Sequence, residues 1–375
     1  MKKKLAALAL LSATGLASAQ SSVTLFGIVD AGLQYLTASG ADSLTRMHSA
    51  GYKGSRIGFR GVEDLGSSMK AGFWLEAGFA SDTGAGYATN TNNQVDGASG
   101  GGGLTFNRRA TISLMAPWGE LRAGRDYGAA YLTHSGFDAF GGVGIAAASN
   151  LTLGLADRII SPKGVTHVRV SNSLAYLLPD TLGGLYGKVM IAFGENSSGV
   201  KDKNDGNYYG ARLGYKSGPF NVVAAYSETK TLQFQNYKDI NMGASYDFSS
   251  FKLTGLIGTE RVGVYTNDAI GFNSDGEVKH NSLNIGAVIP VGAGAIRTSY
   301  TMAKAKSPGH DKLAQGQMLA LGYIHHLSKR TTLFSTYAHT KNDSGAFTHR
   351  YNNGLVSSER GGNTSGFEMG ISHTF

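Results

Sequence analysis

Arginines that alternate with apolar residues are the side chains of this sequence with the clearest chemical meaning. Arg56 and Arg60 alternate with Ile57 and Phe59, and Arg122 also lies between two apolar neighbours. Successive side chains of a strand point to opposite faces, so these arginines would share the face opposite the apolar residues. Guanidinium groups stay charged at every relevant pH, and a cluster of them in a narrow passage concentrates anions. The spacing therefore favours electrostatic attraction of anions, with no bond made or broken.

Other residues that could carry chemistry lack the context that the chemistry needs. Gly97-Ala98-Ser99-Gly100-Gly101 matches the nucleophile pattern G-x-S-x-G, but no strand-then-helix signal flanks it. His325 and His326 are adjacent, so they would point to opposite faces of a strand and make a poor metal pair. The sequence contains no Walker-type phosphate loop and no H-E-x-x-H helix. We therefore predict that the chain is not an enzyme and uses no cofactor or metal.

The elements that must position the arginines are strands. Apolar residues occupy every second position in segments such as 70–79, 185–193, 209–215 and 367–375. A period of two over such lengths indicates strands with one apolar and one polar face. A soluble sandwich could use the same strands, so the connections between them have to discriminate.

Short and long connections alternate along the whole chain. The seven short ones are 62–69, 115–120, 177–185, 216–219, 247–251, 289–295 and 326–331. The eight long ones are 36–55, 79–105, 125–167, 194–207, 228–238, 260–280, 303–315 and 340–366. This rhythm is typical of a membrane barrel with short turns on one side and longer loops on the other. It predicts an all-β fold, a 16-stranded antiparallel transmembrane β-barrel wide enough for an aqueous channel.

Closure into a barrel decides which way the arginines point. An arginine on the lipid-facing side at mid-depth costs about 2–4 kcal/mol, so we expect Arg56, Arg60 and Arg122 to face the water inside. The alternative is that they form ion pairs with carboxylates such as Glu76, stabilise the fold and have no role in selectivity. Asp30 is expected to be an ion-pair partner in the lumen, or else part of the constriction.

The composition agrees with an exported barrel without disulfides. The 375 residues include 54 Gly, only 6 Pro and no Cys. Residues 1–19 have a basic start, an apolar stretch and small residues before the expected cleavage site, which is the layout of a secretory signal. Its removal leaves residues 20–375 as one barrel domain and lowers the net charge from +8 to +5, because three lysines are lost. No later apolar stretch is long enough for a membrane helix, and no basic cluster predicts a nucleic-acid partner.

Four segments spread over both ends of the chain carry a family resemblance. They are 23–32, 55–66, 107–125 and 370–375. Together they resemble the trimeric general porins of Gram-negative bacteria, especially the β-proteobacterial type. The resemblance implies the cell outer membrane, a homotrimer, and a setting of lipid bilayer and lipopolysaccharide. The terminal Phe375 resembles the assembly signal that the outer-membrane insertion machinery recognises.

The longest connection, 125–167, is the third of the long loops. A loop of this length is usually functional, and the resemblance implies that it folds inward and narrows the lumen. Its stretch 137–142 resembles the family's loop-tip motif, with Ala139 where many relatives carry an acid. The missing acid weakens the case for cation selectivity and leaves Asp138 as the nearby carboxylate.

The resemblance also adds candidate arginines to the opposite wall. It places Arg108 and Arg125 beside Arg56, Arg60 and Arg122 at the constriction. Alternation with the following residues instead favours Arg109 as the residue of its pair that faces the lumen, and both alternatives stay open.

Taken together, these features predict an outer-membrane porin for passive diffusion of small hydrophilic solutes and ions, with weak to moderate anion preference. A substrate-specific outer-membrane channel is the alternative. An outer-membrane barrel enzyme would need a catalytic group on a loop or at the lipid edge. A soluble all-β binding protein would stay in buffer without detergent.

Overall fold

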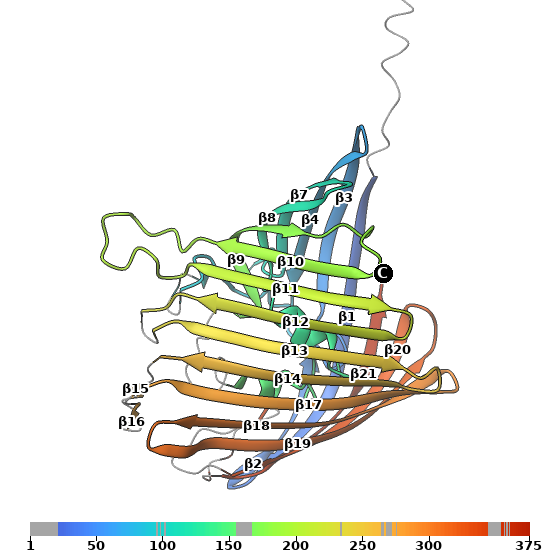
Figure 1. The fold of residues 1–375 in the computed structure, drawn as a ribbon. Helices are drawn as coiled ribbons and strands as arrows, with labels where there is room; N and C mark the ends of the chain where they lie inside the picture. The colour runs from blue at the N-terminus through green and yellow to red at the C-terminus, as the bar shows by residue number, and fades with distance from the viewer. Residues whose placement is uncertain are drawn as a thin grey trace, which may run out of the picture.

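The chain forms one large antiparallel sheet that closes on itself (Figure 1). The structure is a computed structural model. It describes residues 22–375 except 95–96, 98, 101–102, 155–166, 233–234, 264–265, 268–271, 275, 344–353, 356, 358 and 360. The predicted signal peptide, residues 1–19, lies outside the described residues. In Figure 1 the β10–β11 loop and β15–β16 extend from the end of the barrel opposite the C-terminus.

The sheet contains seventeen strands. These are β1 (Ser22–Ala38), β2 (Ala41–Ser49), β3 (Arg56–Gly66), β4 (Met69–Gly78), β7 (Arg109–Ala116), β8 (Gly119–Tyr127), β9 (Arg169–Leu177), β10 (Leu185–Ala192), β11 (Tyr208–Ser217), β12 (Phe220–Thr229), β13 (Tyr237–Asp247), β14 (Lys252–Val262), β17 (Val278–Val291), β18 (Gly294–Ser307), β19 (His310–His326), β20 (Thr331–Asn342) and β21 (Thr364–Thr374). Two small hairpins lie in the loops, formed by β5 (Thr89–Asn90) with β6 (Ser99–Gly100) and by β15 (Thr266–Asn267) with β16 (Phe272–Asn273). The first and last strands pair along residues 28–38 and 364–374, which closes the barrel.

The barrel has sixteen positions because two of the strands share one. β3 pairs with residues 22–28 of β1, and β2 pairs with residues 31–38 of the same strand. β2 and β3 are therefore two halves of one barrel strand, interrupted at residues 50–55. The predicted 16-stranded antiparallel barrel is confirmed.

Asp30 explains why that strand is interrupted. Its buried carboxylate accepts the backbone N–H groups of Gly51 at 2.8 Å and Lys53 at 2.9 Å, and the Ser55 hydroxyl donates to its backbone oxygen. These bonds satisfy amides that would otherwise lack a sheet partner. Asp30 thus holds the backbone of the break. The expectation that it forms an ion pair or lines the constriction was wrong.

Two of the connections predicted to be long loops are tight turns. Residues 39–40 join β1 to β2, and residues 308–309 join β18 to β19. These strands extend beyond the apolar belt. On β18, for example, the outward Lys304 and Lys306 are polar while the inward Ala303 and Ala305 stay buried. The apolar alternation therefore stops before the backbone pairing does.

The two faces of the wall differ as a membrane barrel requires. On β1, Val23, Leu25 and Leu33 are exposed on the outer surface, whereas Asp30 and Gln34 are buried on the inner one. In the membrane the outer residues contact lipid, and the inner residues line a polar interior. Of the described helices, none has the length and apolar character to cross a bilayer.

Candidate functional site

The third long loop lies inside the barrel. It carries two short helices, α2 (Tyr131–Gly136) and α3 (Ser149–Thr152), which contact strands on different parts of the wall. α2 packs against β12 and β13, and α3 packs against β17, β18 and β19. The ring of Phe137 lies so close to β13 that a side chain at Gly243 would come within 2.6 Å of it. The loop therefore crosses the lumen and fills part of it.

Polar bonds fix this loop to the wall at both ends. On α2, the buried His134 ring lies with Nε2 3.1 Å from the Asp239 carboxylate on β13 and Nδ1 3.2 Å from Thr152 on α3. Further along, the backbone N–H of Ile145 donates to Glu368 on β21 at 3.3 Å. Two of these bonds join the loop to strands of the wall and the third joins its two helices, so the loop forms a fixed constriction of the lumen.

Asp138 has a structural task within the loop. Its carboxylate accepts the backbone N–H groups of Phe140, Gly142 and Ala148 at 2.8 to 2.9 Å. Burial raises the pKa of this carboxyl above its ordinary range, against the effect of the three donors. Asp138, predicted at the constriction, lies in this inward loop, where the loop's own amides surround its carboxylate.

Ala139 shows why the acid expected at the loop tip has no place here. Its methyl group lies against the wall, 2.8 Å from where a side chain on Gly286 would begin. A carboxylate at this position would be pressed against β17 without room for a partner. The loop tip consequently adds no free negative charge to the passage.

We predict that Asp138→Ala loosens the constriction. The substitution leaves three buried N–H groups unsatisfied, at roughly 1–3 kcal/mol each, enough to release the loop without opening the barrel. Single-channel recordings should then show larger and noisier conductance than the wild type, and cleavage of the loop by chymotrypsin should be faster, because residues 126–154 contain aromatic side chains but neither Lys nor Arg. Ser135→Ala, in the same loop, is the control and should leave both unchanged. An unaltered conductance in Asp138→Ala would contradict this role.

A cavity of about 930 Å³ separates the third loop from the opposite wall. The charged residues of its lining are nearly all cations, and Asp138 is the single carboxylate among them. The cations that line it are Arg46, Lys53, Arg56, Arg108, Arg169 and Arg297. Because Asp138 is already surrounded by amides, the passage has a large positive surplus.

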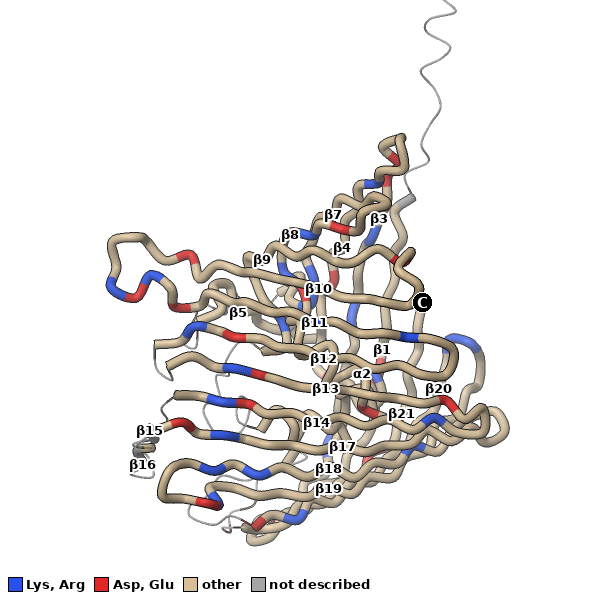
Figure 2. Tube along the Cα trace, viewed as in Figure 1, with Lys and Arg blue, Asp and Glu red and all other residues tan. Residues whose placement is uncertain are grey.

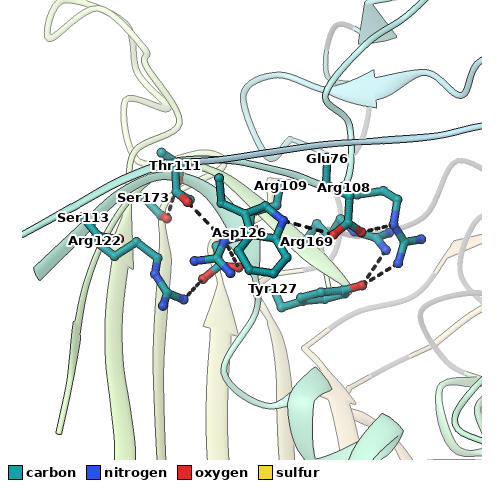
Figure 3. A network of polar contacts seen from close by, with 12 residues as sticks. Glu76, Arg108, Arg109, Thr111, Ser113, Arg122, Asp126, Tyr127, Arg169 and Ser173 are labelled. Carbon is teal, nitrogen blue, oxygen red and sulfur yellow. Dashed lines mark hydrogen bonds and ion pairs between the residues drawn. The ribbon is translucent and has the colours of Figure 1, made fainter. Parts of the chain in front are cut away.

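Three of these arginines form one network, of which Figure 3 shows Arg108 and Arg169 with Glu76 and Tyr127. Glu76 on β4 forms ion pairs with Arg108 and, at 3.5 Å, with Arg56. The Tyr127 hydroxyl accepts from Arg108 at 2.9 Å and from Arg169 at 3.0 Å. The network thus holds three guanidinium groups and one carboxylate, which pairs with two of them, so its net charge is positive by two.

A second network lies further along the same strands, also in Figure 3. Asp126 is within 2.7 Å of Arg122, 3.0 Å of Lys188 and 3.8 Å of Arg109. Arg122 also forms a two-pronged pair with Glu120. Here three cations face two carboxylates, so most of the charge is compensated.

The predicted arginines fall into distinct environments. Arg56 and Arg108 line the cavity, and Arg122 faces the lumen within the compensated network. Arg60 also faces inward, with its guanidinium over the rings of Phe26 at 5.4 Å and Trp74 at 5.2 Å. It is not among the cavity residues.

Both members of the unresolved pair face the lumen. Arg109 is the first residue of β7 and lies over the Trp74 ring at 4.6 Å. Arg108 precedes the strand, so strict alternation does not govern it, and its side chain turns to Glu76. The two alternatives were therefore not exclusive.

Arg125 is not at the constriction. Its guanidinium donates to the backbone oxygens of Asn107 at 2.7 Å and Asn90 at 3.1 Å and to the Ser171 hydroxyl at 2.7 Å. It lies three residues after the inward Arg122, hence on the other face of the strand. There it holds the second long loop, which contains Asn90, against the wall. That prediction was wrong.

Four cavity cations were not predicted. Arg169 lies between Val168 and Val170, the same apolar pattern that singled out Arg56, so the sequence held a usable signal. Lys53 lies in the break between β2 and β3, where the strand alternation of apolar and polar residues is interrupted. Arg297 is buried between the rings of Tyr52 at 5.0 Å and Phe140 at 4.6 Å. The stacking of Arg297 between two rings depends on contacts between distant segments, so no local sequence pattern could predict it.

Nothing in the described part of the chain resembles a metal centre, since no three His, Asp or Glu side chains are grouped. The adjacent histidines have local partners instead. His325 contacts the Tyr323 hydroxyl at 3.1 Å, and His326 contacts Thr332 at 3.1 Å. The segment 97–101, with the pattern G-x-S-x-G, lies partly outside the described residues.

Comparison with known proteins gives consistent results. A family model described as Gram-negative porin matches residues 5–345. The outer membrane porin protein 32 of Delftia acidovorans is 33% identical over the full length of both chains. An outer membrane porin protein of Bordetella pertussis is 31% identical and covers 91% of this chain and 95% of its own.

Solved structures agree with the sequence matches. The anion-selective porin from Comamonas acidovorans has a TM-score of 0.77 and 31% identity, covering 95% of this chain and 100% of its own. The trimer form of OmpT from Vibrio cholerae has a TM-score of 0.58 at 10% identity, covering 95% of this chain and 99% of its own, and shares the fold alone.

Proposed function

Because the chain belongs to the Gram-negative porin family, we propose that its cavity selects anions among the small hydrophilic solutes that diffuse passively through it. The protein is an outer-membrane porin, and its barrel encloses the water-filled channel. The finer assignment is the charge preference. It is supported by a relative of known structure, 31% identical, that is described as anion-selective.

The observation that carries the proposal is the charge of the cavity lining. Six cations line the cavity, and its one carboxylate, Asp138, is already bonded to three amides. Low-dielectric walls focus the field of such a cluster and raise the local anion concentration. We assign the preference to Arg56 and Arg108, with Arg169 beside them. Arg60 and Arg122 have ring or carboxylate partners and would contribute less.

Reversal potentials across planar bilayers test this assignment directly. Purified protein under a KCl gradient should give the sign of a chloride-preferring pore, and vesicles containing it should swell in small uncharged sugars. Salt screening should weaken the preference as the ionic strength rises. A potassium-preferring sign would contradict the selectivity, while absence of swelling would contradict the open channel itself.

A substrate-specific channel remains the second candidate. The rings of Tyr52 and Tyr127 near the cavity could stack on a ligand, but both already contact arginines, Arg297 and Arg169. Saturation of the conductance by one solute and not by others would favour this candidate. The relatives are channels, and we infer that this chain likewise has no enzymatic activity.

We further propose a homotrimer, surrounded by bilayer and lipopolysaccharide and delivered by the outer-membrane insertion machinery. The family resemblance supports each of these partners. A heat-modifiable band at three times the monomer mass is the expected signature of the trimer. Phe375 is proposed as the residue that the insertion machinery recognises.

A further inference from the structure

One arginine of the inner wall rests on two aromatic rings. Arg60 on β3 lies with its guanidinium over Phe26 of β1 and over Trp74, its cross-strand partner on β4. The two rings contact each other edge to face, with centroids 5.0 Å apart, so they form one surface beneath the guanidinium. In Figure 2, blue segments mark basic residues on β3, the strand that carries Arg56 and Arg60. Arg60 is therefore held in place by rings and not by a carboxylate.

The charge of Arg60 is uncompensated. Among the described carboxylates, none forms an ion pair with it, and Glu76, two residues along β4 from Trp74, is already paired with Arg56 and Arg108. Arg60 is exposed, and it faces the lumen. A cation–π contact uses the flat face of a guanidinium and leaves the N–H groups at its edge available. Arg60 thus has the charge and the donors to bind a carboxylate through two parallel hydrogen bonds.

An apolar surface adjoins Arg60 on the same inner face. Val62, two residues further along β3, points the same way and is 50% exposed. Met115 on β7 reaches toward it, since a Cβ on Gly72 would lie 2.9 Å from Met115 Cε and 3.7 Å from Val62 Cγ2. The two side chains therefore meet over the backbone of β4, where Gly72 leaves room for them. The inner face of a membrane barrel is otherwise polar, so this surface is suited to a ligand with an apolar part.

The spacing of the two parts matches one ring with a carboxylate attached. Two residues along a strand span about 7 Å, which is the step from Arg60 to Val62. A carboxylate bonded directly to a six-membered ring covers about this step, with the charged end at Arg60 and the ring on Val62 and Met115. Acetate would reach Arg60 alone. The arrangement therefore discriminates between anions by the body that carries the charge.

We propose that Phe26, Arg60, Val62, Trp74 and Met115 form a binding site for small carboxylates that carry one apolar ring. We call these five residues the Arg60 site. Along β3 it lies beyond Arg56 toward the short turn, and its residues are not among those that line the six-cation cavity. The inference rests on the proposed function in one respect, since the anion must be able to enter the channel. It adds a substrate class to a preference that charge alone would extend to every small anion.

Benzoate and cyclohexanecarboxylate are the probes, and acetate and benzyl alcohol are the comparators. Purified full-length protein is inserted into planar bilayers in KCl, and each compound is titrated on both sides while the current is recorded. A bound anion obstructs the chloride that follows it, so both probes should lower the current. Their half-blocking concentrations should be about tenfold below that of acetate, because acetate gains nothing from the apolar surface. Benzyl alcohol, which has the ring without the charge, should not lower the current.

Two variants test the two halves of the site separately. Arg60→Gln removes the charge, and the half-blocking concentration of benzoate should rise about tenfold. Val62→Thr keeps the shape of the side chain and adds a hydroxyl, and the same concentration should rise about threefold, with no change for acetate. Arg212→Gln is the matched control, because Arg212 also lies over a ring, that of Tyr186 at 5.1 Å, and forms no ion pair in the described part of the chain. It should leave the block by benzoate unchanged.

Heat-modifiable migration in electrophoresis first shows that each variant is folded. An unchanged half-blocking concentration in Arg60→Gln, an equal rise in Arg212→Gln, or equal block by acetate would overturn the proposal. A wild-type pore that has the chloride-preferring sign but is not blocked by benzoate refutes the Arg60 site alone. A potassium-preferring sign in the wild type refutes the proposed selectivity instead, so the two failures are distinguishable.

Discussion

Replacing Arg56, Arg108 and Arg169 with glutamine should remove most of the anion preference of the pore. A unit charge about 8 Å from a permeating ion contributes about 2 kcal/mol at an effective dielectric constant of about 20. Even after screening, losing three such contributions exceeds the 1.4 kcal/mol that corresponds to a factor of about ten. The reversal potential under a KCl gradient should therefore move well toward zero, because Glu76 loses its ion-pair partners and offsets part of the charge of the cations that remain.

One further substitution makes this expectation sharper. Adding Glu76→Gln to the triple variant removes the carboxylate that the lost arginines neutralised, and part of the anion preference should return through Arg46, Lys53 and Arg297. It also removes a buried carboxylate that has lost its ion-pair partners, a loss that costs about 3–5 kcal/mol. Arg330→Gln, in an exposed short turn, is the control for a lost charge elsewhere. An anion preference as strong as that of the wild type in both lumen variants would refute the assignment.

Loss of the terminal aromatic ring should strongly reduce the amount of assembled protein in the outer membrane. Phe375 exchanges two backbone hydrogen bonds with Gly27, both 3.1 Å, and its ring packs over that glycine. Phe375→Ala keeps the two backbone bonds and removes only the ring. Heat-modifiable folded protein in membrane fractions should fall severalfold, while the urea-unfolded variant should still refold in detergent.

Phe367 offers a close control on the same strand. Its side chain faces outward with 42% exposed, against 41% for Phe375, so the loss of apolar contact is similar. Phe367→Ala should assemble nearly as well as the wild type if the position of the ring at the chain end is what matters. Equal defects in the two variants would instead point to lost packing, and no defect in either would contradict an assembly signal at Phe375.

The barrel could be predicted because lipid imposes the same rule on every strand. Wherever a strand crosses the membrane, its outer residues are apolar, and this marks β10 and β21 in the sequence as clearly as in the structure. The rule ends at the edge of the membrane. For that reason the upper parts of β18 and β19, with their outward lysine and glutamine residues, were expected to be a loop.

The constriction could be predicted only in part, for a similar reason. Alternation places Arg56 and Arg122 inside, and applied consistently it would also have placed Arg125 outside and found Arg169. Asp138 could not be placed by any local rule, since its partners are amides of a loop whose path depends on the whole wall. Arg297 is likewise defined by Tyr52 and Phe140, which come from two other parts of the chain.

The pairing of β1 with β21 has a consequence for the cell. The strand exported first cannot find its final neighbour until the last residues of the polypeptide have arrived. A prematurely terminated product therefore has two unsatisfied edges and cannot seal, because unpaired backbone groups are too unfavourable in hydrocarbon. Errors in synthesis or export should yield degradable material in the periplasm and spare the envelope from leaky, half-made pores.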